Sequence, residues 1–208
     1  MTEVGLLNFR TTDFAPETIQ NFIKAQEKQC VLSKHPTLFF RQVEDPKKVY
    51  IIGGWEKNRS PIAKWFVSHD HLACEKLRTD DLEGDWVVHL ELDMGLRLIQ
   101  CGAARIPLSA PVVAITRYFV RPDKTKEFDA SYESLIARHA ANEAPYSYAG
   151  GWRIGGRGLN KEFVFLTGWN EVGDYHLFAA KHVKDLFEGI KSSLKCIQIK
   201  QMRPETWE

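Results

Sequence analysis

Residues 49–77 read VYIIGGWEKNRSPIAKWFVSHDHLACEKL, and this stretch decides the fold. It begins as a buried strand ending in Gly-Gly-Trp-Glu, continues as a polar loop, and becomes a helix whose start is marked by Ser60 and Pro61. Residues 163–190, FVFLTGWNEVGDYHLFAAKHVKDLFEGI, repeat this order of apolar run, Gly-Trp, polar break and helix. A repeat at about half the chain length indicates two copies of one structural module.

The segments around each copy complete a β-α-β-β-α-β pattern. In the first copy the expected strands are 4–10, 37–43, 50–55 and 86–92, and in the second they are 112–120, 146–154, 163–169 and 197–202. Each copy is then a split βαβ unit of the ferredoxin-like type, with two helices on one face of its sheet. The other face would be apolar, so we expect the two halves to pack sheet against sheet. The predicted class is α+β, with a first half at 1–95, a connector at 96–111 and a second half at 112–208.

Composition narrows the function classes. The chain has 208 residues, of which 44% are hydrophobic, enough to build a substantial core. A net charge of +1 argues against nucleic acid as a partner. No apolar run reaches the length needed to span a membrane. The four cysteines are scattered and no HxxxH pattern occurs, so we expect neither a metal site nor disulfides, and a cytoplasmic location.

Three histidines are candidate general bases. His69 and His182 occupy matching steps on the apolar stripes of the second helix in each half, and His139 lies on the stripe of the first helix in the second half. A histidine facing an apolar pocket favours neutral imidazole, which can accept a proton from a phenol or from carbon beside a carbonyl. The alternative is that these are core histidines bonded to backbone carbonyls.

Other side chains are candidates for binding a substrate. Tyr118 and Asn8 are interpreted as holding similar places in the two first strands, where each could hydrogen-bond a substrate oxygen or simply tether a strand end. Five large aromatic side chains are candidate walls of a flat pocket or plain core residues: Trp55, Trp65, Trp152, Trp169 and Phe178.

The order of elements, the strand ends at Trp55-Glu56 and Trp169-Asn170, and the His-bearing helices resemble the dimeric α/β-barrel superfamily. The resemblance is closest to its antibiotic-biosynthesis-monooxygenase branch and covers the chain apart from the connector. Two fused copies would make an intramolecular version of the usual dimer, either as a monomer or as a homodimer of such chains.

This resemblance implies a cofactor-independent monooxygenase or polyketide cyclase that acts on an aromatic or polyketide-like small molecule with His as base. Haem or another flat ligand is the alternative, because Asn8 and Trp65 match positions used by haem-degrading relatives. Those relatives carry a His about ten residues after the Trp, where this chain has Glu75, and His71 comes about one turn earlier. A non-catalytic α/β-barrel scaffold is the third possibility.

Overall fold

The structure is a computed structural model that describes residues 1–55, 82–92, 107–141, 145–155 and 161–206. The chain divides into two compact units: unit 1 contains residues 1–100 and 202–208, and unit 2 contains residues 101–201. The C-terminal residues thus belong with unit 1, whereas the sequence pattern groups them with the second half. Each unit is described separately below.

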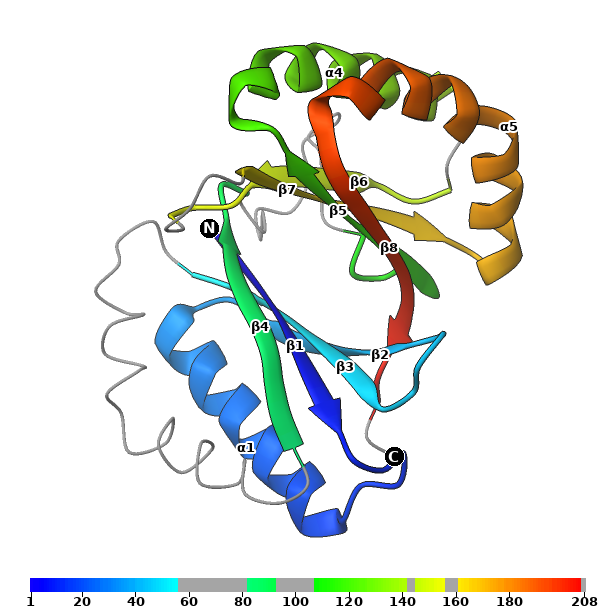
Figure 1. Cartoon of the computed structure of the whole chain (residues 1–208). Coiled ribbons are helices and arrows are strands. Elements are labelled where there is room, and N and C mark those ends of the chain that lie inside the picture. The colour runs from blue at the N-terminus through cyan, green and yellow to red at the C-terminus, as the bar shows by residue number, and fades with distance from the viewer. Residues whose placement is uncertain (56–81, 93–106, 142–144, 156–160, 207–208) are drawn as a thin grey trace. The chain divides into compact units, whose positions relative to one another are not determined.

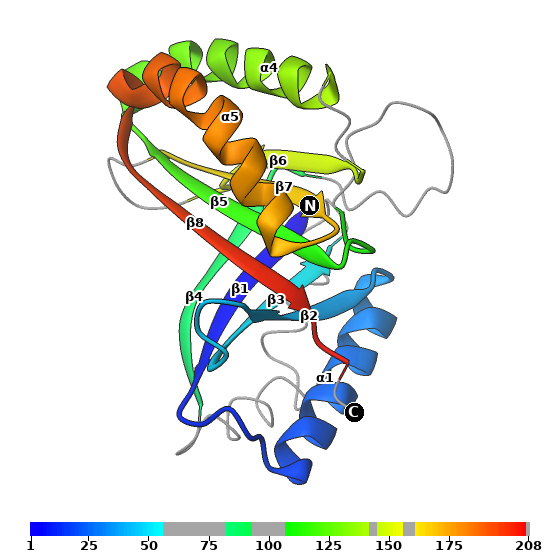
Figure 2. The ribbon, with the colours of Figure 1, turned by 90° about the vertical axis from the view of Figure 1, so that its right-hand side faces the viewer.

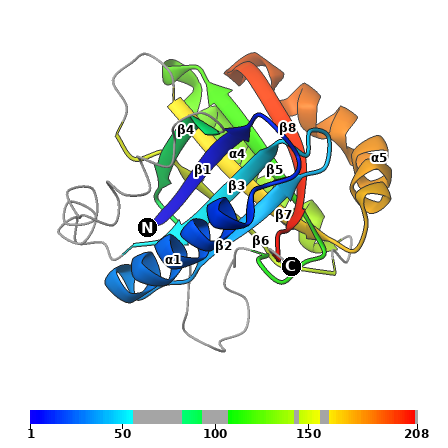
Figure 3. The same cartoon turned by 90° about the horizontal axis from the view of Figure 1, so that it is seen from below.

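Unit 1 is an antiparallel sheet with the strand order β4-β1-β3-β2, and α1 lies against one of its faces (Figures 1 and 3). The predicted second helix of this half, with Trp65 and His69, falls at residues 56–81, outside the described residues. The described elements are β1 (Thr2–Phe9), α1 (Pro16–Ser33), β2 (Thr37–Gln42), β3 (Lys48–Gly54) and β4 (Leu82–Leu90).

Unit 2 shows the complete β-α-β-β-α-β order, and its strand order β8-β5-β7-β6 is equivalent to that of unit 1. Both of its long helices cover the same face of the sheet (Figure 2). The predicted α+β, ferredoxin-like class is therefore confirmed. The elements are β5 (Val112–Val120), η1 (Pro122–Lys124), α4 (Thr125–Ala141), β6 (Tyr148–Trp152), β7 (Lys161–Trp169), α5 (Val172–Ile190), η2 (Lys191–Ser193) and β8 (Leu194–Pro204).

The helix boundaries follow local chemistry. Pro16 opens α1, where a missing backbone N–H costs nothing, and Lys34 ends it with a φ of 58°, in the left-handed region. Helix α5 begins with a reciprocal capping box, in which Glu171 and Asp174 each bond the other's backbone N–H. These caps place α5 directly after Trp169, so its side chains return over β5 and β7.

The strand registers show which residues of the two units are equivalent. Thr2 faces Gly54 on the neighbouring strand, and Val113 faces Gly168 in the same way. Counting along the strands from these pairs, Tyr118 corresponds to Leu7, not to Asn8. Asn8 lies between Leu7 and Phe9, which face α1, so it is on the opposite face of the sheet. The predicted equivalence of Asn8 and Tyr118 is therefore wrong by one residue, which reverses the face.

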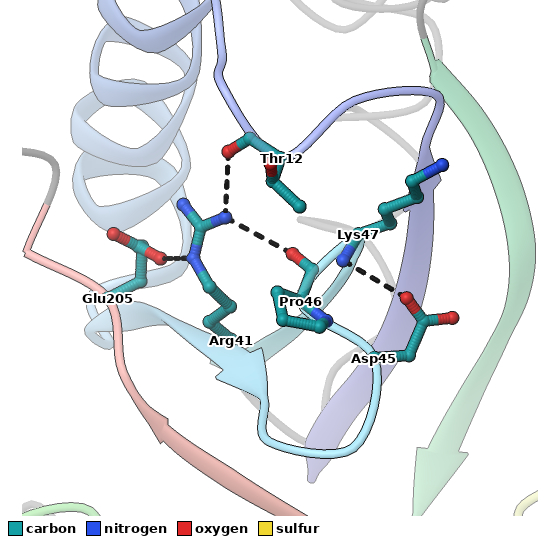
Figure 4. A network of polar contacts seen from close by, with 6 residues as sticks. All are labelled: Thr12, Arg41, Asp45, Pro46, Lys47 and Glu205. Carbon is teal, nitrogen blue, oxygen red and sulfur yellow. Dashed lines mark hydrogen bonds and ion pairs between the residues drawn. The ribbon is translucent and has the colours of Figure 1, made fainter.

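Arg41 fixes the C-terminal segment onto unit 1 (Figure 4). Its Nε forms an ion pair with Glu205, and its Nη1 donates to the backbone oxygens of Thr12 and Pro46, each at 3.1 Å. The guanidinium also lies 4.4 Å from the centroid of the Phe14 ring. The last residues of β8 pair with β2, with Arg41 opposite Arg203. One side chain therefore satisfies two loops and the end of the chain together.

Candidate functional site

A polar belt crosses the helix-facing side of the unit 2 sheet. We use this name for Thr116 and Tyr118 on β5 and Thr167 on β7. Thr167 lies opposite Ala114, and Thr116 lies opposite Phe165. All three side chains of the polar belt are 6% exposed. Hydroxyl groups buried in an apolar layer are costly unless they are bonded, so their partners decide what the belt is for.

Helix α5 carries a row of aromatic side chains above this sheet. Phe178 packs on Trp169 with 5.2 Å between ring centroids, and His182 packs on Phe178 at 4.9 Å. Phe178 and His182 are four residues apart, which places them on the same side of the helix. His182 is half-buried, so its ring is neither sealed in the core nor fully in solvent.

Two separate apolar clusters flank the polar belt. One contains Val112, Ala114 and Trp169, with Phe178 packed against it. The other contains buried Tyr118, Val120, Phe128, Phe163, Phe165, Ile190 and Leu194, with Phe187 packed against them. On α5, His182 lies between Phe178 of the first cluster and Phe187 of the second. On the sheet, Thr116 and Thr167 lie between the two clusters, Tyr118 belongs to the second cluster, and His182 lies along α5 between the residues that contact the two clusters.

The hydroxyls of the polar belt differ in their partners. Thr167 Oγ1 accepts a 2.9 Å hydrogen bond from Trp169 Nε1. Among the described residues, no group forms a hydrogen bond with the hydroxyl of Thr116 or with that of Tyr118, and neither oxygen belongs to the fully buried side-chain atoms that lack a partner. Two largely buried residues whose hydroxyls have no partner in the described ranges, in the layer that also contains His182, could bond a polar ligand atom.

Burial also sets the protonation of the phenols. Burial, and secondarily the nearby Tyr175 phenol, raises the pKa of Tyr118 well above its usual value of 10.0. Burial likewise raises the pKa of Tyr132, with smaller contributions from Tyr118 and Tyr148. Both phenols are therefore neutral donors at pH 7 and poor bases. His182 supplies an imidazole in this layer, the side-chain type most often used as a general base.

The remaining predicted site residues are distributed as follows. His139 lies in α4, and its side chain is outside the described part of the structure, as are Trp65 and His69. Trp152 donates from Nε1 to Asp129 Oδ1 at 3.1 Å and packs edge-on against Phe128, so its contacts are those of a core residue. Of the predicted residues, the structure brings Tyr118, Trp169, Phe178 and His182 into one layer.

Sequence reasoning did not single out Thr116 or Thr167. Their only sequence signal is that they are small polar residues at alternate positions of otherwise apolar strands. This signal can be interpreted only when it is known which face of each strand lies under the helices. The described residues contain no group of three or more side chains suited to hold a metal ion. No helix in the described ranges is long and apolar enough to cross a membrane.

No protein-family model matches the chain, and no curated protein matches it in sequence. Solved structures do match, over 99% of the chain. A proposed monooxygenase from Fusobacterium nucleatum gives a TM-score of 0.65 at 11% identity over 93% of its length. An anthrone oxidase-like protein gives 0.63 at 12% identity over 91%. A haem-binding protein from Thermus thermophilus gives 0.58 at 10% identity over 91%.

The fold and the helix–sheet layer define the class. The chain has an α+β, ferredoxin-like fold, and its likeness to these structures runs over nearly the full length of each. At identities of 14% or less the likeness concerns the fold alone, because one fold hosts unrelated chemistries.

Proposed function

We propose that the chain is a cofactor-independent enzyme acting on an aromatic or polyketide-like small molecule, with His182 as general base. Tyr118 donates a hydrogen bond to the oxygen on which negative charge develops. His139 is a further candidate base on α4, and His69 is the corresponding candidate in the first half. The observation that carries the proposal is that Thr116 and Tyr118, whose hydroxyls have no hydrogen-bond partner among the described residues, lie in the same helix–sheet layer as His182.

An anthrone illustrates the chemistry. Neutral His182 accepts a proton from the methylene carbon, and the electron pair moves to the ring carbonyl oxygen to give an enolate. The Tyr118 hydroxyl, kept protonated by burial, stabilises that oxygen as a preorganised donor. Dioxygen then reacts at the carbon. One oxygen atom becomes a new carbonyl and the other leaves as water with both methylene hydrogens, so anthrone and dioxygen give anthraquinone and water.

The aromatic side chains support a flat substrate. Trp169 and Phe178 form one end of the helix–sheet layer, and Tyr118 with Phe163 forms the other. Aromatic faces bind flat apolar rings while the few polar groups orient them. The structural likeness to an anthrone oxidase-like protein and to proposed monooxygenases adds to this reasoning. The same base and donor would equally serve a cyclisation, in which the enolate attacks a carbonyl of its own chain.

Haem is the alternative ligand, and of the residues that support it in the sequence, Trp65, His71 and Glu75 lie outside the described residues. In unit 2 the rings beside the polar belt are in contact, with Tyr132 4.5 Å from Phe163 and Phe178 5.2 Å from Trp169. A flat ligand over the belt, whether porphyrin or anthrone, would have to separate one of these pairs. In unit 1, Asn8 faces away from α1. We therefore derive no step through haem, and a haemin titration serves as a control.

The test is turnover of anthrone by the full chain, followed as dioxygen uptake and anthraquinone absorbance. We expect His182→Ala to lower kcat by about 100-fold, the usual contribution of a general base. His176→Ala is the matched control, because His176 is an exposed residue of the same helix, and it should retain activity. Unchanged turnover in both His182→Ala and His139→Ala would exclude this mechanism. If neither anthrone nor haemin binds the unmodified chain, the non-catalytic scaffold becomes the better explanation.

A further inference from the structure

Unit 1 contains a histidine–carboxylate pair that the proposed function does not use. His89 Nε2 lies 3.0 Å from Glu3 Oε2. The Glu3 carboxylate also accepts hydrogen bonds from Trp55 Nε1 at 3.0 Å and from Gln29 Nε2 at 3.3 Å. The Glu3 side chain is 13% exposed and that of His89 is 23% exposed. The Glu3 carboxylate is therefore held by several donors, whereas part of the His89 ring is exposed.

The pair stands in one row across the sheet of unit 1. His89 on β4 faces Glu3 on β1, Glu3 faces Gly53 on β3, and Gly53 faces Thr37 on β2. A Cβ at Gly53 would lie 3.2 Å from Gln29 Nε2, so the absence of a side chain there lets the Gln29 amide approach the sheet beside Glu3. Strands and α1 together hold the carboxylate from three directions.

Unit 2 shows that the fold does not require this carboxylate. By register, Glu3 corresponds to Ala114 and Gly53 corresponds to Thr167. The equivalent tryptophan, Trp169, is satisfied by the Thr167 hydroxyl instead of a carboxylate. Burying a carboxylate is costly and needs several donors to offset the loss of water. Unit 1 uses a charged acceptor for its tryptophan, whereas unit 2 builds the same fold with a neutral acceptor. This difference indicates that the carboxylate has a chemical role in unit 1.

The hydrogen bonds define what the pair can do. A carboxylate accepts and does not donate, so a hydrogen bond between His89 and Glu3 requires a proton on His89 Nε2. The Nδ1 atom then carries the lone pair, and no described residue hydrogen-bonds to it. This is the geometry of a base whose tautomer is fixed by a buried acid. Glu3 acts as a positioning residue, and His89 accepts the proton.

We propose that unit 1 holds a second proton-transfer site, in which His89 Nδ1 takes a proton from carbon beside a carbonyl of a small molecule at the β4 edge. The electron pair moves to the carbonyl oxygen to form an enolate. Return of the proton to another carbon completes an isomerisation, so the step needs neither oxidant nor metal. This site is independent of the one proposed for unit 2.

A small aromatic probe tests the base directly. In 5-nitrobenzisoxazole, removal of the ring C–H proton breaks the N–O bond, leaves a nitrile, and releases a coloured phenolate. The reaction is measured in the full chain carrying both His182→Ala and His139→Ala, so that neither candidate base of unit 2 can contribute. We expect His89→Gln, which keeps an amide donor for Glu3, to lower the rate at least about tenfold, and His176→Gln to leave it unchanged. A His89→Gln rate equal to that of the parent would overturn the proposal.

A second measurement starts from the unmodified chain. Nitrogen-15 NMR of the ring of His89 in the unmodified chain should show the tautomer protonated at Nε2, whereas an exposed histidine exchanges between forms. Glu3→Gln should shift that population, because an amide can either accept from or donate to the ring. An Nδ1-protonated ring in the unmodified chain would sink the proposal even if the substituted proteins failed to fold. Neither result depends on whether anthrone is a substrate.

Discussion

The two units place different chemistry on the same row of the same sheet. In unit 1 the row reads His89, Glu3, Gly53 and Thr37, and in unit 2 its equivalent reads Ala114, Thr167 and Tyr148. Both rows end near a buried tryptophan whose Nε1 must find an acceptor, a carboxylate in unit 1 and a hydroxyl in unit 2. The two units share the strand pairing of this row but differ in its polar side chains.

This difference separates what the fold needs from what a site needs. The fold needs an apolar layer, a helix that begins just after the tryptophan, and one acceptor for its indole N–H. Everything beyond that is free to differ between copies. The charge of unit 1 and the polar belt of unit 2 are both beyond that minimum, and so both are candidates for function.

Two glycines near the tryptophan ends of β7 and β3, Gly168 and Gly53, give the largest expected effect, although they are not equivalent in register. A Cβ at Gly168 would lie 2.5 Å from Tyr146 Cβ and 2.7 Å from Pro107 Cβ, whereas one at Gly53 meets the flexible Gln29 amide at 3.2 Å. We expect Gly168→Ala to lower the free energy of unfolding by about 3 kcal/mol and Gly53→Ala by about 1 kcal/mol. Urea denaturation measures both. Gly173→Ala, with open space around it, is the control, and equal losses at Gly168 and Gly53 would contradict the packing argument.

The sequence was sufficient to predict the modules, because their signals are local. The repeat of apolar run, Gly-Trp and helix recurs in both halves, and β5 was predicted with its observed bounds, Val112–Val120. Strand β4 was predicted four residues late, since its first residues are exposed and polar, with no apolar alternation. Such an edge strand is held by backbone pairing with β1, which composition does not reveal.

The candidate sites were only partly predictable, because they depend on register. His182 and Phe178 follow from helical periodicity alone. The pairing of Glu3 with His89 joins residues 86 positions apart and exists only because β1 and β4 are neighbours in a stated register. The misplaced equivalence of Asn8 with Tyr118 has the same origin, since a shift of one residue exchanges the two faces of a strand.

Removing the acceptor of the tryptophan N–H in each unit is expected to cause an intermediate loss of unfolding free energy. Glu3→Ala leaves the Trp55 and Gln29 donors unbonded, and we expect a loss of about 2 to 3 kcal/mol of unfolding free energy. Thr167→Val keeps the shape and removes one neutral acceptor, so a loss of about 1 kcal/mol is expected. Chemical denaturation with tryptophan fluorescence reports both. A larger loss in Thr167→Val than in Glu3→Ala would show that the carboxylate is not the stronger acceptor.

The smallest effect on stability is expected where the polar belt has no partner among the described residues. Thr116→Val and Tyr118→Phe remove buried hydroxyls that no described residue bonds, so the unfolding free energy should stay within about 0.5 kcal/mol or rise. Thr167→Val is the matched control that does lose a bond. If Tyr118 donates to the developing oxyanion, Tyr118→Phe should still lower kcat for anthrone by at least about tenfold. Unchanged stability together with lower turnover would not be expected of a structural hydroxyl, because removing a structural hydroxyl lowers the free energy of unfolding.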